Sequence, residues 1–366
     1  MKNKSDPTNH ENNLNSKREK SNQGDQKIES HVISYGLSRH FSPQLRTTAA
    51  QYGNGCFDKL WIFTPNVEKS FLRSCSSYIF KARGFNVKAA YQCYSNEHQV
   101  SFQLFKYSPE RWKIQINPSD TNWPTLKNIL RQIMGTKVYK MGQYEITRLD
   151  IAVNLPRSHY KVDTFVYSTY CKYRRATACY LDAVIKQRSG IWTGYELGVH
   201  PFKFMIYDTS FKDDWDTQPI DDEPPIRIEA QLCSYRHVAR IGITRIKHLA
   251  RLVESNPYAR LVSFHDCVKS ITGDMIESRR SRLANFIIEV RVQGFHNARG
   301  DYNRANNNFE RDFCDVIPPL LVGTDQVPME IVLFESLKRS LTEYFTAPQN
   351  SKAIKPLPSI LENTFV

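Results

Sequence analysis

Residues 145–155 have the sequence Glu-Ile-Thr-Arg-Leu-Asp-Ile-Ala-Val-Asn-Leu, in which polar and apolar side chains alternate. Successive side chains of a β-strand point to opposite faces of the sheet. Arg148, Asp150 and Asn154 are therefore expected on one face. The other face would carry only apolar side chains, namely Leu149, Ile151 and Val153.

Residues 226–232, Ile-Arg-Ile-Glu-Ala-Gln-Leu, repeat this arrangement. Arg227, Glu229 and Gln231 would share a face, opposite a row of apolar residues. The two segments predict strands with an apolar back and a front of arginines and carboxylates.

The remaining pattern predicts an α+β fold with a mainly antiparallel sheet flanked by helices, because strands and helices do not alternate regularly. Further strands are expected over 59–63, 87–94, 99–105, 111–116, 191–197 and 201–207. Residues 284–292 also alternate as a strand does. Helical spacing predicts helices over 123–135 and 328–345, a basic amphipathic segment over 238–255, and partly helical structure over 161–188.

The chain divides by composition into three parts. Residues 1–35 are polar and poor in apolar side chains, so we expect a disordered tail. Residues 36–300 would form the folded domain that carries the site, and residues 301–366 a C-terminal helical extension.

The net charge indicates a class of partner. The 366 residues include 50 Lys and Arg against 37 Asp and Glu, which gives +13 at pH 7. A basic balance of this size favours a polyanion such as nucleic acid. No apolar run is long enough to cross a bilayer and the amino terminus lacks a signal-peptide core, so we expect a cytoplasmic protein without a membrane partner.

Several kinds of chemistry have no supporting motif. No phosphate-binding glycine loop, no Gly-x-Ser-x-Gly and no His-x-His occurs, and the 8 cysteines show no zinc spacing. ATP hydrolysis is therefore not expected.

The oxygen-bearing side chains favour a hard metal ion. Asp150, Glu229 and Asn154 offer the ligands that Mg²⁺ or Mn²⁺ prefers. Such an ion polarises a phosphodiester. The alternative is that each carboxylate simply pairs with an arginine on its own sheet face.

A tyrosine offers a nucleophile. In residues 203–208, Lys203, Met205 and Tyr207 would lie on one side of a strand, with Tyr207 beside Asp208. A phenol oxygen that attacks phosphorus forms a covalent phosphotyrosine. The alternative is that Tyr207 is a packing residue.

An interleaved aromatic and basic segment suggests contact with single-stranded DNA, because bases stack on rings while cations meet phosphates. Its residues are Lys172, Tyr173, Arg174 and Arg175. A helix with half-buried tyrosines would show the same pattern.

Taken in order, residues 146–153, 194–198, 206–208 and 227–229 resemble the replication initiation factor family of rolling-circle plasmid and filamentous phage initiators and related conjugative-element relaxases. This resemblance implies a variant of the histidine-motif (HUH-like) endonuclease sheet with acidic ligands. It implies Asp150 and Glu229 as ligands and Tyr207 as nucleophile.

The chain departs from the family's pattern at two places. Asn154 stands near a position where the family often has a second acid, and Thr209 stands where a lysine often follows Tyr-Asp. Lys203 or Lys212 would supply the missing cation. The other candidates for the nucleophile are Tyr195, Tyr180 and Tyr235.

The expected function is that of an origin-specific single-strand DNA endonuclease and transferase, which starts rolling-circle replication or transfer of a mobile element. Arg148 and Arg227 would hold phosphate oxygens or fix the carboxylates. The basic residues of 236–251 would grip the duplex part of a single-stranded or cruciform origin, or form a plain packing helix. A host helicase and polymerase would act with the protein. The alternatives are a non-catalytic DNA-binding protein, such as a repressor or an origin-marking factor, and an RNA-binding or packaging protein.

Overall fold

The computed structural model of this chain describes residues 52–74, 76–79, 86–95, 100–135, 144–172, 178–180, 194–198, 200–209, 225–269, 275–305, 307–323 and 325–348. The tail predicted for residues 1–35 and the end of the predicted C-terminal extension lie outside these ranges.

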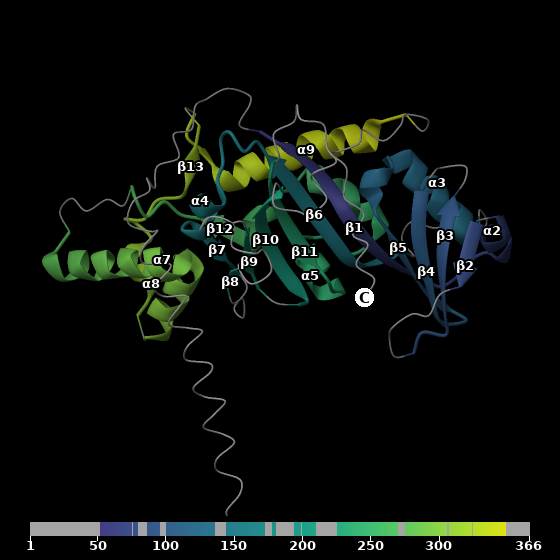
Figure 1. The fold of residues 1–366 in the computed structure, drawn as a ribbon, viewed down its shortest axis with the longest axis horizontal. Coiled ribbons are helices and arrows are strands. Elements are labelled where there is room, and N and C mark those ends of the chain that lie inside the picture. Colours follow the sequence, from purple (N-terminus) through teal and green to yellow (C-terminus); the bar gives the residue numbers. More distant parts are fainter. Residues whose placement is uncertain are drawn as a thin grey trace, which may run out of the picture.

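The fold is α+β and centres on one large antiparallel sheet (Figure 1). Within the described ranges its 10 strands follow the order β2-β3-β4-β5-β1-β6-β11-β10-β9-β8. The bounds are β1 Asn54–Thr64, β2 Ser76–Ile79, β3 Ala89–Ser95, β4 Val100–Ser108, β5 Arg111–Ile116, β6 Glu145–Leu155, β8 Ala178–Tyr180, β9 Gly194–Leu197, β10 Phe202–Asp208 and β11 Ile226–Leu232. The predicted fold class is confirmed at this level. The two segments that decided it are β6 and β11, which pair directly.

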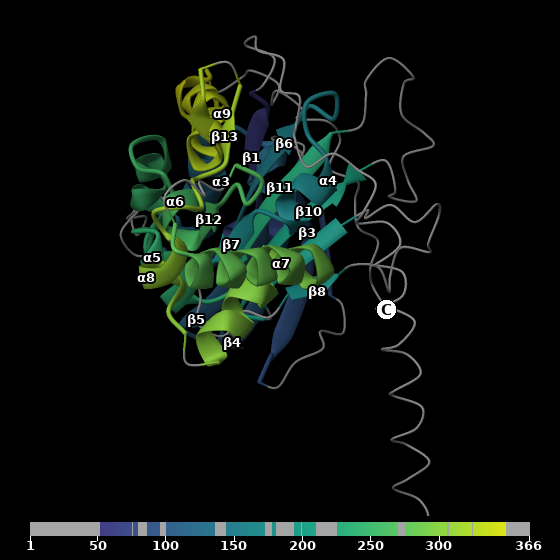
Figure 2. The same ribbon diagram turned by 90° about the vertical axis from the view of Figure 1, so that its left-hand side faces the viewer.

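Helices cover one face of the sheet (Figures 1 and 2). The helices and short turns outside the second core are α2 Lys69–Ser74, η2 Pro118–Asp120, α3 Trp123–Met134, α4 Val162–Val166, α5 Tyr235–Arg240, η7 Ile246–Val253, α6 Tyr258–Leu261 and α9 Met329–Thr346. Leu149 and Ile151 of β6 and Ile228 of β11 are fully buried against this layer in the main core. Each such side chain contributes about 1.5–3 kcal/mol to folding.

Helix α9 also completes the hydrogen bonding of β1. The backbone N–H groups of Gly53 and Gly55 lie before the point where β5 begins to pair with β1. They donate instead to the hydroxyls of Ser336 and Ser340 on α9, each at 3.0 Å. The absence of a side chain on Gly55 allows this approach, since an added Cβ would lie 2.5 Å from the Cα of Leu337.

A second hydrophobic cluster lies beside the sheet. Its elements are α7 Glu277–Arg304 and α8 Phe309–Phe313, next to β7 Thr169–Cys171 and β12 Val262–Phe264, with β13 Leu321–Val322 and β14 Val327–Pro328 between α8 and α9. Phe286, Phe295, Phe309 and Phe313 form its centre. The predicted domain boundary at residue 300 falls inside α7, and α9 packs into the main core rather than apart from it.

One local prediction was wrong. Residues 284–292 belong to α7, where Phe286 and Val290 are buried one turn apart while Ile288 and Val292 are exposed. Phe286 and Val290 are four residues apart, so they share a face both in a strand and in a helix. The alternation of 284–292 therefore did not distinguish the two.

The partly helical structure expected from residue 161 onward is present as the short α4, which β7 follows. Residues 238–255 form the end of α5 and the 3₁₀ turns of η7. Among the described residues, we find no helix with the length and apolar character that spanning a bilayer requires.

We predict that Gly55→Val lowers the free energy of unfolding by about 2–3 kcal/mol, because the new side chain overlaps the backbone of α9 and must push the helix away. Urea denaturation measures this change. Gly300→Ala is the control: a Cβ there meets nothing within 4 Å, and alanine stabilises a helix interior. Wild-type stability of Gly55→Val would contradict the packing of α9 on β1.

Candidate functional site

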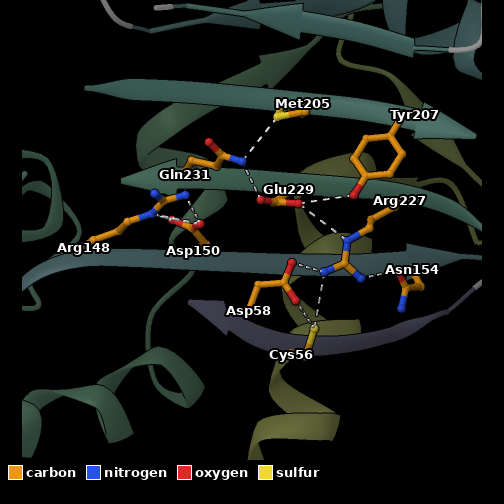
Figure 3. Close-up of polar contacts among 10 residues, drawn as sticks. All are labelled: Cys56, Asp58, Arg148, Asp150, Asn154, Met205, Tyr207, Arg227, Glu229 and Gln231. Atoms are coloured by element: carbon orange, nitrogen blue, oxygen red, sulfur yellow. Dashed lines mark hydrogen bonds and ion pairs between the residues drawn. The ribbon is translucent and has the colours of Figure 1, made fainter. Parts of the chain in front are cut away.

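The polar rows of β6 and β11 lie on one face of the sheet, as their alternation predicted. In the register between the strands, Arg227 lies opposite Asn154 and Gln231 opposite Asp150. This is the face that the helices named above do not cover (Figure 2). Figure 3 shows how the side chains on this face contact one another.

Asp150 is held by its neighbour on the same strand. Both of its carboxylate oxygens accept hydrogen bonds from Arg148, from Nε at 2.9 and 3.1 Å and from Nη2 at 2.6 Å. Burial, with a smaller contribution from the nearby Glu229, raises the pKa of Asp150 to about 7 against the lowering effect of Arg148. The carboxyl thus titrates near neutral pH although it is paired.

Arg227 links three strands. Its guanidinium donates to Asn154 Oδ1 on β6 at 3.0 Å and forms an ion pair with Asp58 on β1. Its Nε lies 3.6 Å from Glu229 Oε2 on its own strand. Burial alone would lower the pKa of Arg227, but Asp58 and the other acidic groups around it hold that pKa well above its usual value.

Asp58 and Cys56 of β1 belong to this cluster and were not predicted. A register shift between Phe57 and Lys59 interrupts the alternation of β1, so a simple count by twos does not assign Asp58 to a face. The signal that was available is the charged Asp58-Lys59 pair in the middle of the strand, between apolar residues on either side.

Glu229 lies between a phenol and an amide. The hydroxyl of Tyr207 donates to Glu229 Oε2 at 3.3 Å, and Gln231 Nε2 donates to Oε1 at 2.7 Å. Burial, together with the adjacent Glu229 charge, raises the pKa of Tyr207 well above its usual value. Tyr207 is therefore a neutral phenol whose proton already points at a carboxylate.

Lys203 lies on β10 with Tyr207 but forms a different contact. Its Nζ pairs with Glu196 on β9 at 2.8 Å, and it sits opposite Gln231 while Tyr207 sits opposite Arg227. The structure therefore places Lys203 beside the cluster, in an ion pair of its own.

The other candidate tyrosines are placed differently. Tyr195 is fully buried in the main core, with the apolar side chains behind the sheet. Tyr235 is 41% exposed at the start of α5. Tyr180 belongs to β8.

The predicted DNA-contact segment is only partly visible. Lys172 is exposed and its Nζ donates to the carbonyl of Ala259 at 2.7 Å. Tyr173, Arg174, Arg175 and Lys212 lie outside the described residues.

The proposed metal ligands have suitable oxygen atoms, but those atoms have other partners here. Asp150 accepts from Arg148, Asn154 from Arg227, and Glu229 from Gln231 and Tyr207. Among the described residues, no group of three or more His, Cys, Asp and Glu is placed to hold an ion. A cation at this site would have to displace guanidinium contacts.

No family model matches this chain, and no curated protein matches it either.

We predict that the stability of the protein depends on pH through Asp150. The folded carboxyl has a pKa near 7 and the unfolded one near 3.8, so between these values the folded state binds the extra proton. The free energy of unfolding contributed by this group therefore falls as pH rises from about 4 to 7. The Asp150→Asn variant has no carboxyl to titrate, and its amide oxygen can still accept a hydrogen bond from Arg148.

Urea unfolding of both proteins at pH 5, 6, 7 and 8 measures the effect. The stability of Asp150→Asn relative to wild type should increase by on the order of 2–4 kcal/mol across this range. Parallel pH profiles would show that Asp150 is ionised throughout.

Proposed function

We propose that this protein is a single-strand DNA endonuclease and transferase that nicks an origin and remains joined to the 5′ end through Tyr207. It would thereby start rolling-circle replication or transfer of a mobile element. The observation that carries the proposal is the contact of the Tyr207 hydroxyl with Glu229, at 3.3 Å, on the sheet face that also holds Arg227. The resemblance of four segments to the replication initiation factor family agrees with it.

The contact supports a transesterification. The phenol oxygen attacks phosphorus, its proton passes to Glu229, and the bond from phosphorus to the 3′ oxygen breaks. The leaving 3′ oxygen takes a proton from water and becomes the free hydroxyl that a polymerase extends. The high pKa of Tyr207 means that the phenol needs this base.

Arg227 provides the positive charge for the transition state. A guanidinium binds two phosphate oxygens through parallel hydrogen bonds, as it binds a carboxylate. A scissile phosphate would compete with Asp58 and Asn154 for Arg227. Arg148 would remain with Asp150 unless a cation takes that carboxylate.

The proposed reaction includes a divalent ion, Mg²⁺ or Mn²⁺, because the candidate ligands offer oxygen atoms, which these ions prefer. Asp150, Glu229 and Asn154 would hold it in place of some of their present hydrogen-bond partners. When bound, the ion would polarise the scissile phosphate.

The proposal includes macromolecular partners. The substrate would be a single-stranded or cruciform origin, and the overall sheet arrangement would be a variant of the HUH-like endonuclease fold. Because the sequence has no nucleotide-binding loop, a host helicase would open the DNA and a host polymerase would extend the 3′ end.

We predict that Tyr207→Phe abolishes the covalent adduct, lowering its yield by more than 100-fold, since the attacking oxygen is gone. Wild-type protein incubated with supercoiled origin plasmid and Mn²⁺ should give nicked circles with protein on the 5′ end. Denaturing gels after nuclease digestion measure the adduct. Tyr235→Phe is the matched control, because Tyr235 lies away from the cluster, and it should retain wild-type yield.

Binding of the origin should stay within a few-fold of wild type in Tyr207→Phe. A normal adduct yield from this variant would remove Tyr207 from the reaction.

We predict that the wild-type protein binds Mn²⁺ and that Asp150→Ala reduces the affinity at least tenfold, because one of the two carboxylate ligands is lost. Electron paramagnetic resonance of free Mn²⁺ measures this without any DNA. Glu196→Ala, which removes a carboxylate from the neighbouring ion pair with Lys203, is the control and should bind normally. Equal affinity of all three proteins would exclude these ligands.

A second function has its own supporting observation. Asp150 is fully buried and held at both oxygens by Arg148, which suits a structural ion pair as well as a ligand. The protein would then bind DNA without cutting it, as a repressor or origin-marking factor. Origin binding without nicking, unchanged in Tyr207→Phe, would favour this second function.

A further inference from the structure

The sheet face that the described helices do not cover carries a second group of side chains beside the acid and tyrosine cluster. Aromatic rings and cations from β1, β4 and β5 lie against one another there. We call this group the aromatic strip, and its members are Trp61, Phe63, Phe105, Tyr107, Arg111 and Lys113.

The contacts show that the strip is continuous. The ammonium of Lys113 lies 4.4 Å from the ring centre of Trp61, 4.7 Å from that of Phe105 and 5.9 Å from that of Tyr107. Arg111 lies over Phe63 at 4.5 Å, and Phe63 contacts Tyr107 edge-on at 5.8 Å.

The strip joins the candidate site through one residue. The guanidinium of Arg148 lies 4.7 Å from the ring centre of Trp61, and the same guanidinium holds Asp150. Trp61 is paired directly with Arg148 across β1 and β6, so both point to the same face. A ligand on the strip would therefore lead directly to the acids.

Lys113 has an unusual environment for a lysine. It is half-buried, and among the described residues its ammonium makes no ion pair with a carboxylate. Burial and the nearby Arg148 lower the pKa of Lys113 to about 8. A phosphate group would supply the negative charge that the surroundings lack.

The charge of the strip favours a polyanion. On the strip's face, β4 and β5 contribute the cations Arg111 and Lys113, and neither strand contains Asp or Glu. Acids lie at the margin of the strip: Glu145 on β6 is paired with Phe63, and Glu110 precedes Arg111 in the turn between β4 and β5. Cations over aromatic rings also keep an exposed sheet surface hydrated, but that role does not require a half-buried lysine that pairs with no carboxylate of the described residues.

We propose that the aromatic strip binds single-stranded DNA, with phosphates at Lys113 and Arg111 and bases against the rings of Phe63 and Tyr107. Stacking requires unpaired bases, which duplex DNA does not present. The choice of DNA over RNA rests on the proposed nicking function, because the cations and aromatic rings of the strip would suit single-stranded DNA and single-stranded RNA equally.

The experiment measures binding of a fluorescent 20-nucleotide DNA by anisotropy, with all variants made in the Tyr207→Phe protein to prevent cleavage. Lys113→Met should weaken binding about 5–10-fold at low salt and reduce the slope of log affinity against log salt by about 0.7, the value for one phosphate contact. Lys113→Arg should restore binding. Glu145→Gln should strengthen binding about twofold, because it removes one of the acids at the margin.

Lys127→Met is the matched control. Lys127 lies over Trp123 at 5.9 Å on α3, which covers the opposite face of the sheet. Its loss removes the same charge and the same kind of ring contact, and should change the affinity less than twofold. If Lys113→Met does not fold, Arg111→Gln on the exposed end of β5 tests the same surface.

Wild-type affinity and salt slope in Lys113→Met or Arg111→Gln would overturn the proposal. Two further results would overturn it. One is duplex DNA that binds as tightly as single-stranded DNA and loses as much affinity in Lys113→Met. The other is an RNA of the same sequence that binds more tightly than the DNA. The two proposals fail separately. If Lys113→Met loses DNA binding but the wild-type protein does not nick, the strip proposal holds and the nicking proposal fails. If a Lys113→Met variant that keeps Tyr207 nicks as the wild type does, the nicking proposal holds and the strip proposal fails.

Discussion

The arrangement of the site depends on a buried guanidinium. Arg227 is surrounded by Asp58, Asn154 and Glu229, which come from three adjacent strands. Bringing acids from β1, β6 and β11 onto one buried surface would be costly without a positive charge among them. Arg227 offsets that repulsion and at the same time holds the three strands at one place on the sheet.

The same balance of charges determines the protonation states of the groups in the cluster. Burial raises the pKa of Asp150 to about 7 despite its pairing with Arg148, and the nearby Glu229 adds a smaller contribution in the same direction. Tyr207 stays protonated beside Glu229. In the proposed reaction a phosphate would bind Arg227 by replacing carboxylate contacts, which would couple substrate binding to the position of the proton and to the ion pairs. The cluster is thus both a structural link and a candidate reaction centre.

The sequence predicted those strands in which polar and apolar residues alternate strictly. Strands β6 and β11 were found with their faces, because Leu149, Ile151 and Ile228 alternate cleanly with polar residues. Asp58 was missed because the register shift in β1 breaks that alternation. The aromatic strip was missed because its rings and cations come from three strands whose pairing only the fold provides. In α7, two periods coincided locally and the tertiary packing of Phe286 and Val290 decided between them.

The most direct test of this account is mass spectrometry of the protein after reaction with origin DNA and complete nuclease digestion. The account predicts a single tyrosine that carries a nucleotide, on the peptide containing Tyr207. A nucleotide on Tyr180, Tyr235 or any other residue, with Tyr207 unmodified, would contradict it.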